Sequence, residues 1–275
     1  MGCSDSDYDF LRRLVRARSA NVVAPAGNAL FENRLKPIAR TAGAANLKEL
    51  VGLLRSNPSP HLQRTVAEAM TIHETSFFRD KSVFDVLGET VLPHLLEANS
   101  SQRRLRIWSA AASTGQEAYS VAMLLSERFQ QLAGWDVKII GTDVALNAVE
   151  EARRGVYRRM DVNRGLPARL LLKYFNRSGD EWEIAPGLRA MCEFQHANLC
   201  GPLPPLPQFD LVLLRNVLLY FTPEDRGAAF QNVDSRMSAN GYLVLGASEQ
   251  AEDSTRLFEP EFAGGCYFYR RAARR

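Results

Sequence analysis

The fold class is decided by the stretch Leu105-Arg106-Ile107-Trp108-Ser109-Ala110-Ala111-Ala112-Ser113-Thr114-Gly115-Gln116-Glu117. Its first six residues carry branched and aromatic side chains and end in small ones, a pattern typical of a buried strand. Gly115 then opens a segment with apolar residues at helical spacing up to Phe129. A strand that passes through a turn of small residues into a helix is the first half of a βαβ unit.

The segments that follow repeat this alternation. We expect strands at residues 137–142, 210–214 and 242–245 (the last after a turn at Asn240-Gly241), and helices at 146–154 and 223–237. Continuous apolar strands that alternate with helices indicate a parallel sheet with helices on both faces. The sequence therefore predicts an α/β, Rossmann-like, doubly wound domain over residues 104–275.

Three other regions depart from this rhythm. Residues 1–70 show helical periodicity and no strand pattern, so we expect an N-terminal all-helical domain there, followed by a linker and connecting helix at 71–103. Short strands at 182–184 and 190–194, around Pro186-Gly187, predict a small antiparallel β-subdomain inserted at 157–195. Residues 266–269 are expected to form a final edge strand.

The composition is that of an ordinary globular protein. Hydrophobic residues make up 46% and charged residues 24%, and the net charge of +3 does not require a nucleic-acid partner. The four cysteines form no C-x-x-C pair, which argues against a zinc ribbon or a disulfide framework. We find no secretory signal and no apolar run that would insert into a membrane, so we expect a cytoplasmic location.

Two acidic residues follow the first two strands of the predicted sheet. Ligands of doubly wound sheets bind beyond the carboxyl ends of the strands. Glu117 places a carboxylate at the start of the helix after the first strand, where it suits a ligand with a positive charge. Asp143 ends the second strand and can accept hydrogen bonds from ribose hydroxyls, although it can also cap the helix that begins near Leu146. The turn lacks the G-x-G-x-x-G pattern of dinucleotide phosphate binding.

Polar residues also meet at two further places. Arg215 and Asn216 come directly after the buried strand 210–214. Burying these polar side chains costs free energy unless both form hydrogen bonds, which points to a site. The alternative is an arginine on the surface and an asparagine that caps a helix. Residues 71–80 carry a dense mixture of polar and aromatic side chains in the connection between domains, where pockets are common. The alternative for this segment is an interdomain hinge filled by Phe77 and Phe78.

Several motifs in the same order resemble one known family. The stretch His73-Glu74-Thr75-Ser76-Phe77-Phe78-Arg79-Asp80 resembles the N-E-T-x-F-F-R-D signature of the CheR family, the chemotaxis-receptor glutamate O-methyltransferases. Residues 108–120, 141–143 and 209–221 resemble three further blocks of that family, and residues 241–249 resemble its closing G-Y-L-x-L-G-x-S-E. The resemblance extends from the end of the helical region to near the C-terminus.

The resemblance implies methyl transfer from S-adenosylmethionine to glutamate carboxylates of a chemoreceptor, which yields methyl esters and S-adenosylhomocysteine. It assigns Arg79 and Tyr220 to catalysis. The resemblance places Tyr220 near the transferred methyl group, and we expect Arg79 to orient the substrate carboxylate by fork-like hydrogen bonds. The residues that it assigns to the cofactor site are His73, Thr75, Arg79, Glu117, Asp143, Asn198, Leu199, Arg215 and Asn216.

The implied partner is a methyl-accepting chemotaxis receptor with an acidic helical methylation region. Two basic clusters could complement it, although a solvated face is the alternative; they are Arg12, Arg13, Arg16 and Arg18, and Arg34, Lys36 and Arg40. In some family members the β-subdomain binds a C-terminal pentapeptide of the receptor. The resemblance also implies a monomer, and the mild net charge leads us to expect no nucleic acid as partner.

The sequence departs from the family pattern at three positions and leaves competing functions to weigh. His73 stands where the family usually has Asn, Ala112 replaces Cys, and Ala118 replaces Pro. A non-catalytic module that binds the cofactor, a nucleotide or the receptor is an alternative that His73 favours. A nucleotide-dependent oxidoreductase is disfavoured by the missing glycine pattern. We expect no metal, because the evenly spaced Cys192, His196 and Cys200 fall in a predicted strand segment.

Overall fold

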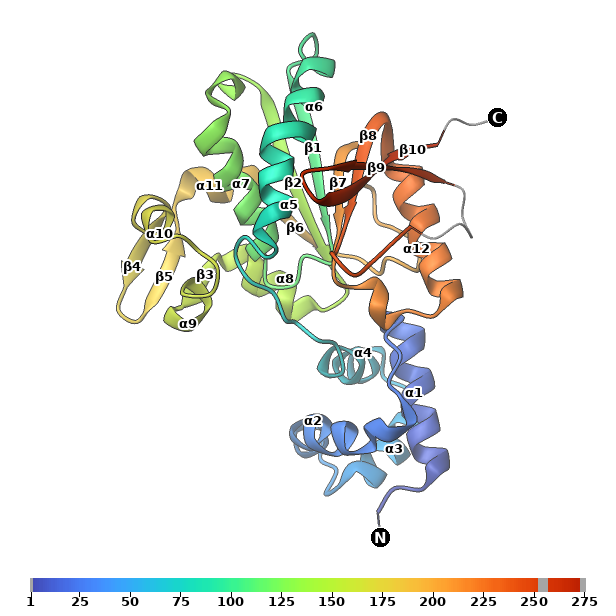
Figure 1. Ribbon diagram of the computed structural model, residues 1–275. Helices are drawn as coiled ribbons and strands as arrows, with labels where there is room; N and C mark the ends of the chain where they lie inside the picture. The colour runs from blue at the N-terminus through green and yellow to red at the C-terminus, as the bar shows by residue number, and fades with distance from the viewer. Residues whose placement is uncertain (1, 252–256, 273–275) are drawn as a thin grey trace. The chain divides into compact units, whose positions relative to one another are not determined.

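The computed structural model describes residues 2–251 and 257–272, which form two compact units (Figure 1). One unit comprises the chain up to Ile72 together with Tyr220–Arg226, and the other comprises His73–Leu219 and the chain from Gly227 onward. The expected domain ends at residues 1 and 275 lie outside the described residues, and the domain boundaries stay predictions. No helix in the described ranges is both long and apolar enough to cross a membrane.

The N-terminal unit is helical, as predicted. Its helices are α1 (Asp5–Ser19), η1 (Pro25–Gly27), α2 (Asn28–Thr41), α3 (Leu47–Ser56) and α4 (Pro60–Ala69). Its core is formed by apolar residues at helical spacing, among them Leu11, Phe31 and Leu50, all fully buried. The Asn46 side chain accepts a hydrogen bond from the Glu49 amide at 3.0 Å and so caps the start of α3.

The second unit is built on a seven-stranded sheet in the order β6-β2-β1-β7-β8-β10-β9. Its strands are β1 (Arg104–Ala110), β2 (Asp136–Asp143), β6 (Cys192–His196), β7 (Phe209–Leu214), β8 (Met237–Leu245), β9 (Phe258–Ala263) and β10 (Cys266–Arg271). The first five strands of that order are parallel, and β10 is antiparallel to both β8 and β9. The chain moves outward from β1 to β6 on one side and from β7 to β9 on the other, so the strand order reverses between β1 and β7.

Helices bury the sheet, which confirms the predicted α/β doubly wound class. They are α5 (Lys81–Val86), η2 (Leu87–Val91), α6 (Leu92–Ala98), α7 (Gln116–Arg128), η3 (Gln130–Leu132), α8 (Leu146–Arg154) and α12 (Pro223–Arg236). Successive side chains of a strand point to opposite faces. Accordingly, Ile107 packs in the core that includes Leu92 and Val121, whereas its neighbour Trp108 stacks on Phe209 with ring centroids 5.2 Å apart.

A small antiparallel sheet is present, but one strand expected in it lies elsewhere. The small sheet has the order β3-β5-β4 (Val156–Arg158, Glu181–Ile184 and Phe175–Ser178), accompanied by α9 (Arg159–Val162), α10 (Ala168–Tyr174) and α11 (Pro186–Met191). A strand expected at 190–194 is present, but it begins only at Cys192, after α11, and its assignment to the small antiparallel sheet was wrong: as β6 it extends the large sheet parallel to β2. Gly141 makes room for this pairing, because a Cβ there would lie 2.4 Å from the Phe194 ring.

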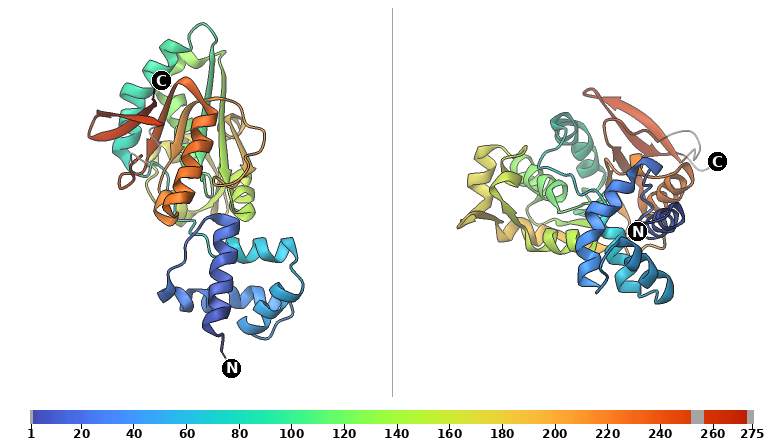
Figure 2. Two further views of the ribbon diagram at one scale, coloured as in Figure 1. Left: turned by 90° about the vertical axis from the view of Figure 1, so that its right-hand side faces the viewer. Right: turned by 90° about the horizontal axis from the view of Figure 1, so that it is seen from below.

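Two predictions for the C-terminal strands were also wrong. The segment 266–269 is not an edge strand, because β10 lies between β8 and β9. Pro260 lies in β9, the true edge, where a missing N–H is tolerated. Asn240-Gly241 forms no separate turn: β8 already begins at Met237, and the pairing with β7 shifts register before Tyr242. The β9–β10 hairpin and the small sheet lie at opposite ends of this unit (Figure 2).

Candidate active site

Backbone strain gathers where the parallel strands end. Seven non-glycine residues in the described ranges have a positive φ, and five of them lie in three segments of the sheet unit. These five are Ala111 and Ser113 after β1, Asn216 after β7, and Phe78 and Asp80 in the segment before α5. Each such conformation costs about 1–3 kcal/mol and persists where the surroundings enforce it, commonly at functional sites. The observation points to the carboxyl ends of β1 and β7 as the site.

Asp143 joins the end of β2 to the loop after β1. Its Oδ2 accepts a hydrogen bond from the Ser113 amide at 2.8 Å, and its Oδ1 accepts one from the Ala145 amide at 3.0 Å. Burial raises the pKa of Asp143, while backbone N–H groups and the nearby His73 act in the opposite direction. Asp143 thus supports the turn before α8 and fixes the loop after β1, but it does not cap α8, whose N-cap is Ala145 with no side-chain cap.

Glu117 and Arg215 form a buried ion pair between α7 and the end of β7. Arg215 Nη1 donates to Glu117 Oε2 at 2.8 Å, and the Ser109 hydroxyl donates to Glu117 Oε1 at 2.7 Å. Arg215 Nη2 also donates to Asp80 Oδ2 at 2.8 Å and to the Arg79 carbonyl at 2.9 Å. Only 2% of the Arg215 side chain is exposed. The structure therefore uses Arg215 to join three segments and excludes the surface-arginine alternative.

The backbone of Asn216 is fixed by the side chain of Glu249. The Asn216 amide donates to Glu249 Oε2 at 2.6 Å, and the Leu218 amide donates to Glu249 Oε1 at 2.8 Å. The Gly246 amide adds a third bond, to Oε2 at 2.9 Å. The carboxylate thus connects the loop after β8 with η4 (Leu218–Tyr220) and the end of β7.

The segment from His73 to Asp80 packs within the sheet unit. The Ser113 hydroxyl donates to the His73 carbonyl at 3.3 Å, and the Phe78 amide donates to the Ser120 hydroxyl at 2.9 Å. Phe77 is fully buried, with ring centroids 5.0 Å from Tyr157 and 5.6 Å from Phe175. Phe77 therefore belongs to the core beside the small sheet, which contradicts the alternative of a hinge filled by this ring.

Arg79 and Thr75 also lie on this segment. The Arg79 side chain is half-buried, and its Nη1 donates to the Glu74 carbonyl at 2.9 Å. Glu74 itself pairs with Arg164 at 2.5 Å, and this partner lowers the pKa of Glu74. Thr75 is half-buried. The roles of Thr75 and Arg79 toward a ligand stay predictions.

Asn198 and Leu199 follow β6 and reach the end of β2 through the backbone. The Ala197 amide donates to the Asp143 carbonyl at 2.9 Å. Asn198 therefore directly follows a residue that is hydrogen-bonded to the end of β2. The Asn198 side chain accepts from the Cys200 amide at 2.9 Å, and the Leu199 carbonyl accepts from Asn232 at 2.8 Å. These contacts fix the segment, and its expected place beside an adenine ring stays a prediction.

Tyr220 is not grouped with the other candidate residues. It ends η4, and from Tyr220 to Arg226 the chain belongs to the helical unit. There its carbonyl accepts a hydrogen bond from the Val22 amide at 3.0 Å. A position of the phenol near the transferred methyl group stays a prediction.

Some arginines of the two expected basic clusters serve the helical unit itself. Arg12 pairs with Asp9 at 2.8 Å, and Arg16 pairs with Asp225 at 3.0 Å. Arg34 donates to the Thr71 carbonyl at 2.8 Å and to the Ala69 carbonyl at 3.3 Å, and so binds the end of α4. Other members of the clusters, including Arg13, Lys36 and Arg40, have exposed side chains.

Three residues of the network were missed by sequence reasoning. Ser109 and Asp80 contact the Glu117–Arg215 pair, and Glu249 holds the loop after β7. Asp80 and Glu249 close two of the quoted motifs, so the signal was their position at motif ends. Ser109, one residue before the end of β1, gave no signal beyond its polarity in an apolar strand.

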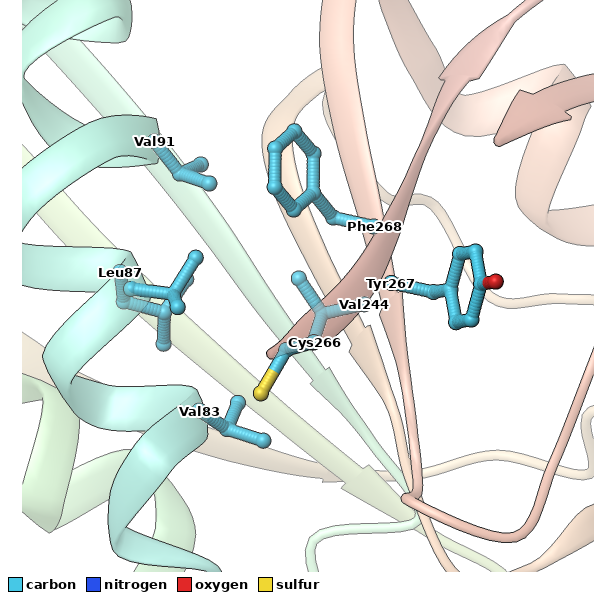
Figure 3. A pocket seen from close by; sticks show the side chains of 8 residues that line it. Val83, Leu87, Val91, Val244, Cys266, Tyr267 and Phe268 are labelled. Atoms are coloured by element: carbon cyan, nitrogen blue, oxygen red, sulfur yellow. The ribbon is translucent and has the colours of Figure 1, made fainter. Parts of the chain in front are cut away.

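A small apolar pocket lies elsewhere in the sheet unit (Figure 3). Val83, Leu87 and Val91 point from helical segments toward Cys266 and Phe268, and the Tyr267 ring turns to the other side of its strand. With no charged residue in its lining, this pocket does not suit a cationic or ribose-containing ligand. Within the described part of the chain no cluster of side chains fits a metal ion, Cys192, His196 and Cys200 included.

Comparison with known proteins agrees with this geometry. Residues 73–264 match the sequence model of the family described as CheR methyltransferase, SAM binding domain. Chemotaxis protein methyltransferase 1 of Pseudomonas aeruginosa is 35% identical over 90% of this chain and 92% of its own length. Chemotaxis protein methyltransferase of Vibrio parahaemolyticus is 32% identical over 93% of each chain.

A structural comparison gives a weaker similarity. A TehB-like SAM-dependent methyltransferase from Corynebacterium glutamicum matches 70% of this chain and 96% of its own, with a TM-score of 0.40 and 12% identity. The family match covers the segments that form the site, from His73 past Glu249. The chain belongs to the CheR methyltransferase family and is a methyltransferase that uses S-adenosylmethionine.

Proposed function

We propose that this methyltransferase modifies glutamate side chains of a chemoreceptor, producing glutamate methyl esters and S-adenosylhomocysteine. The curated relatives are named chemotaxis protein methyltransferases, and this supports a substrate in the chemotaxis pathway. The single structural observation that carries the proposal is the Glu117–Arg215 pair where the strand order reverses, next to the loop after β1 that Asp143 holds.

The residues present fit the cofactor. The Asp143 carboxylate at the end of β2 suits the two ribose hydroxyls, and the segment beginning at Asn198 is joined to the same strand end by the bond from the Ala197 amide. The Glu117 carboxylate provides the negative charge that favours a sulfonium group. The bound cofactor supplies a methyl group on a positively charged sulfur, which makes that carbon open to attack by a nucleophile.

The acceptor carboxylate needs no general base. A glutamate side chain has an unperturbed pKa of about 4.3 and is ionised near neutral pH, so the nucleophile is present before binding. The task of the protein is to orient the carboxylate in line with the methyl group and to exclude water from it. Catalysis in this account therefore depends on positioning rather than on proton transfer.

Arg79 is our candidate for orienting the acceptor carboxylate. In the described residues, the Glu74 carbonyl occupies only Nη1 of its guanidinium, so further N–H donors remain for a fork-like pair of hydrogen bonds. Tyr220 is proposed to lie beside the methyl path. Arg79 must hold the carboxylate loosely enough to preserve its nucleophilicity.

An acidic helical surface of the receptor is the proposed partner. The exposed Arg13, Lys36 and Arg40 of the helical unit provide complementary charge, which steers association at low salt. Strand β4 pairs with β5 in the small sheet, and an added peptide strand there is the proposed mode for a receptor tether peptide. We propose that the protein acts as a monomer in the cytoplasm.

The test is transfer of a labelled methyl group from S-adenosylmethionine to a purified receptor cytoplasmic fragment. The proposal expects label on the receptor that mild alkali releases as methanol, because esters hydrolyse and amine or thioether methylation does not. A receptor with its methylation-site glutamates replaced by alanine is the matched control and should stay unlabelled. Alkali-stable label, or equal labelling of the alanine receptor, would refute glutamate as the acceptor.

A further inference from the structure

Glu249 is a buried carboxylate that the reaction described above does not use. Only 9% of the residue is exposed, and its two oxygens accept three backbone hydrogen bonds, from Asn216, Leu218 and Gly246. No lysine, arginine or histidine in the described ranges forms an ion pair with it. Among the described residues, backbone N–H groups are therefore its hydrogen-bond partners. Burying this carboxylate costs free energy unless all three of these hydrogen bonds form.

These bonds determine the conformation of the loop that carries Arg215 and Asn216. Asn216 has a φ of 59°, a left-handed conformation that is unfavourable for most residues. Its amide makes the shortest of the three bonds, at 2.6 Å. Gly246 permits the close approach, since a Cβ at that position would lie 2.6 Å from Glu249 Oε2 and 2.9 Å from the Asn216 amide nitrogen.

The loop in turn presents the arginine of the buried ion pair. Arg215 immediately precedes Asn216, and its guanidinium contacts Glu117, Asp80 and the Arg79 carbonyl. A change in the backbone at Asn216 would rotate Arg215 away from Glu117. We infer that Glu249 is a positioning residue for the cofactor site, which acts through the backbone of Asn216 and has no direct contact with the ligand.

The perturbation is Glu249→Gln, which keeps the shape and removes one acceptor oxygen. The amide group offers a single oxygen for three N–H groups, and its NH₂ faces at least one of them as a second donor. The left-handed conformation of Asn216 is then no longer enforced. We expect the Kd for S-adenosylhomocysteine to rise about tenfold, which corresponds to about 1.4 kcal/mol.

Asp210→Asn is the matched control in the same sheet. Asp210 is also 9% exposed, and its carboxylate accepts from the Arg106 amide at 2.8 Å and from the Ser238 hydroxyl at 3.3 Å. It lies near the start of β7, at the opposite end of the strand from Arg215. Both variants neutralise a buried carboxylate: Glu249, in the loop after β8, binds backbone that follows β7, and Asp210 lies near the start of β7.

The experiment measures Tm and calorimetric Kd for both variants, with titration well below either Tm. A positioning role predicts lower Tm in both but weaker S-adenosylhomocysteine binding in Glu249→Gln alone, with a raised KM for S-adenosylmethionine and an unchanged KM for the receptor. Wild-type affinity in folded Glu249→Gln, or equal weakening in Asp210→Asn, would overturn the inference. The inference rests on cofactor binding and not on the identity of the methyl acceptor, so a wild-type protein that methylates another substrate leaves it standing.

Discussion

Replacing Arg215 with methionine should destabilise the protein and weaken cofactor binding at the same time. The substitution keeps an unbranched apolar side chain, so little volume is lost, but it removes the guanidinium that joins Glu117, Asp80 and the Arg79 carbonyl. The two carboxylates then lose a buried partner.

The magnitude follows from the exposure of the groups left behind. Removing one partner of a buried ion pair costs about 3–5 kcal/mol. The side chain of Asp80 is 35% exposed and can be hydrated again, whereas that of Glu117 is 13% exposed and keeps the Ser109 hydroxyl as a partner. We therefore expect the lower end of the range, about 3 kcal/mol, and a fall in Tm of about 6–12 °C.

Thermal unfolding with and without S-adenosylhomocysteine is the assay, and Arg271→Met is the control. Arg271 pairs with Asp234 through two bonds, Nε to Oδ1 at 2.5 Å and Nη2 to Oδ2 at 2.9 Å, and joins β10 to α12 instead of the loops of the site. Both variants should unfold earlier, but saturating ligand should raise the Tm of Arg271→Met as it does in the wild type and that of Arg215→Met by less. An unchanged Tm for Arg215→Met, or an undiminished ligand effect, would refute the reasoning.

Three further changes test other parts of the account. Arg79→Ala should reduce turnover more than it reduces S-adenosylhomocysteine affinity, and equal losses in kinetics and calorimetry would exclude its role in orienting the acceptor. The pKa of Glu127 is lowered from 4.5 to about 2 by hydrogen bonds from Lys173, Tyr174 and Arg169. Glu127 therefore stabilises the fold above pH 4.5, and this contribution is lost as the pH falls toward 2. The Tm difference between the wild type and Glu127→Gln should shrink over that interval, and a constant difference would contradict the assignment. Gly141→Ala should cost about 1–3 kcal/mol in urea unfolding, because the new Cβ would lie 2.4 Å from the Phe194 ring, and wild-type stability would show that β6 does not pack there.

The sequence predicted the features that depend on local pattern. The strand, small-residue turn and helix around Ser113 could be read from residue spacing, and the positions after strands placed Asp143, Glu117 and Arg215 at one edge of the sheet, as observed. The position of the site could be predicted because ligands bind beyond the carboxyl ends of parallel strands, and this rule requires only the order of the strands and helices.

The features that depend on distant contacts could not be predicted in this way. The pairing of β6 with β2 depends on the space that Gly141 leaves for Phe194, two residues far apart in the sequence. The place of β10 inside the sheet depends on β9, whose Glu259, Pro260 and Glu261 obscure a strand pattern. In the sequence Glu249 only closes one of the quoted motifs, and the structure is needed to show that its oxygens accept hydrogen bonds from the amides after β7.

The most direct test of the site is calorimetric titration of the wild-type protein with S-adenosylhomocysteine, with NAD titrated in parallel. The carboxylates of Glu117 at the start of α7 and Asp143 at the end of β2, together with the absence of a phosphate-binding glycine pattern, predict micromolar binding of S-adenosylhomocysteine and no binding of NAD. A folded protein that binds NAD, or that fails to bind S-adenosylhomocysteine, would contradict the account.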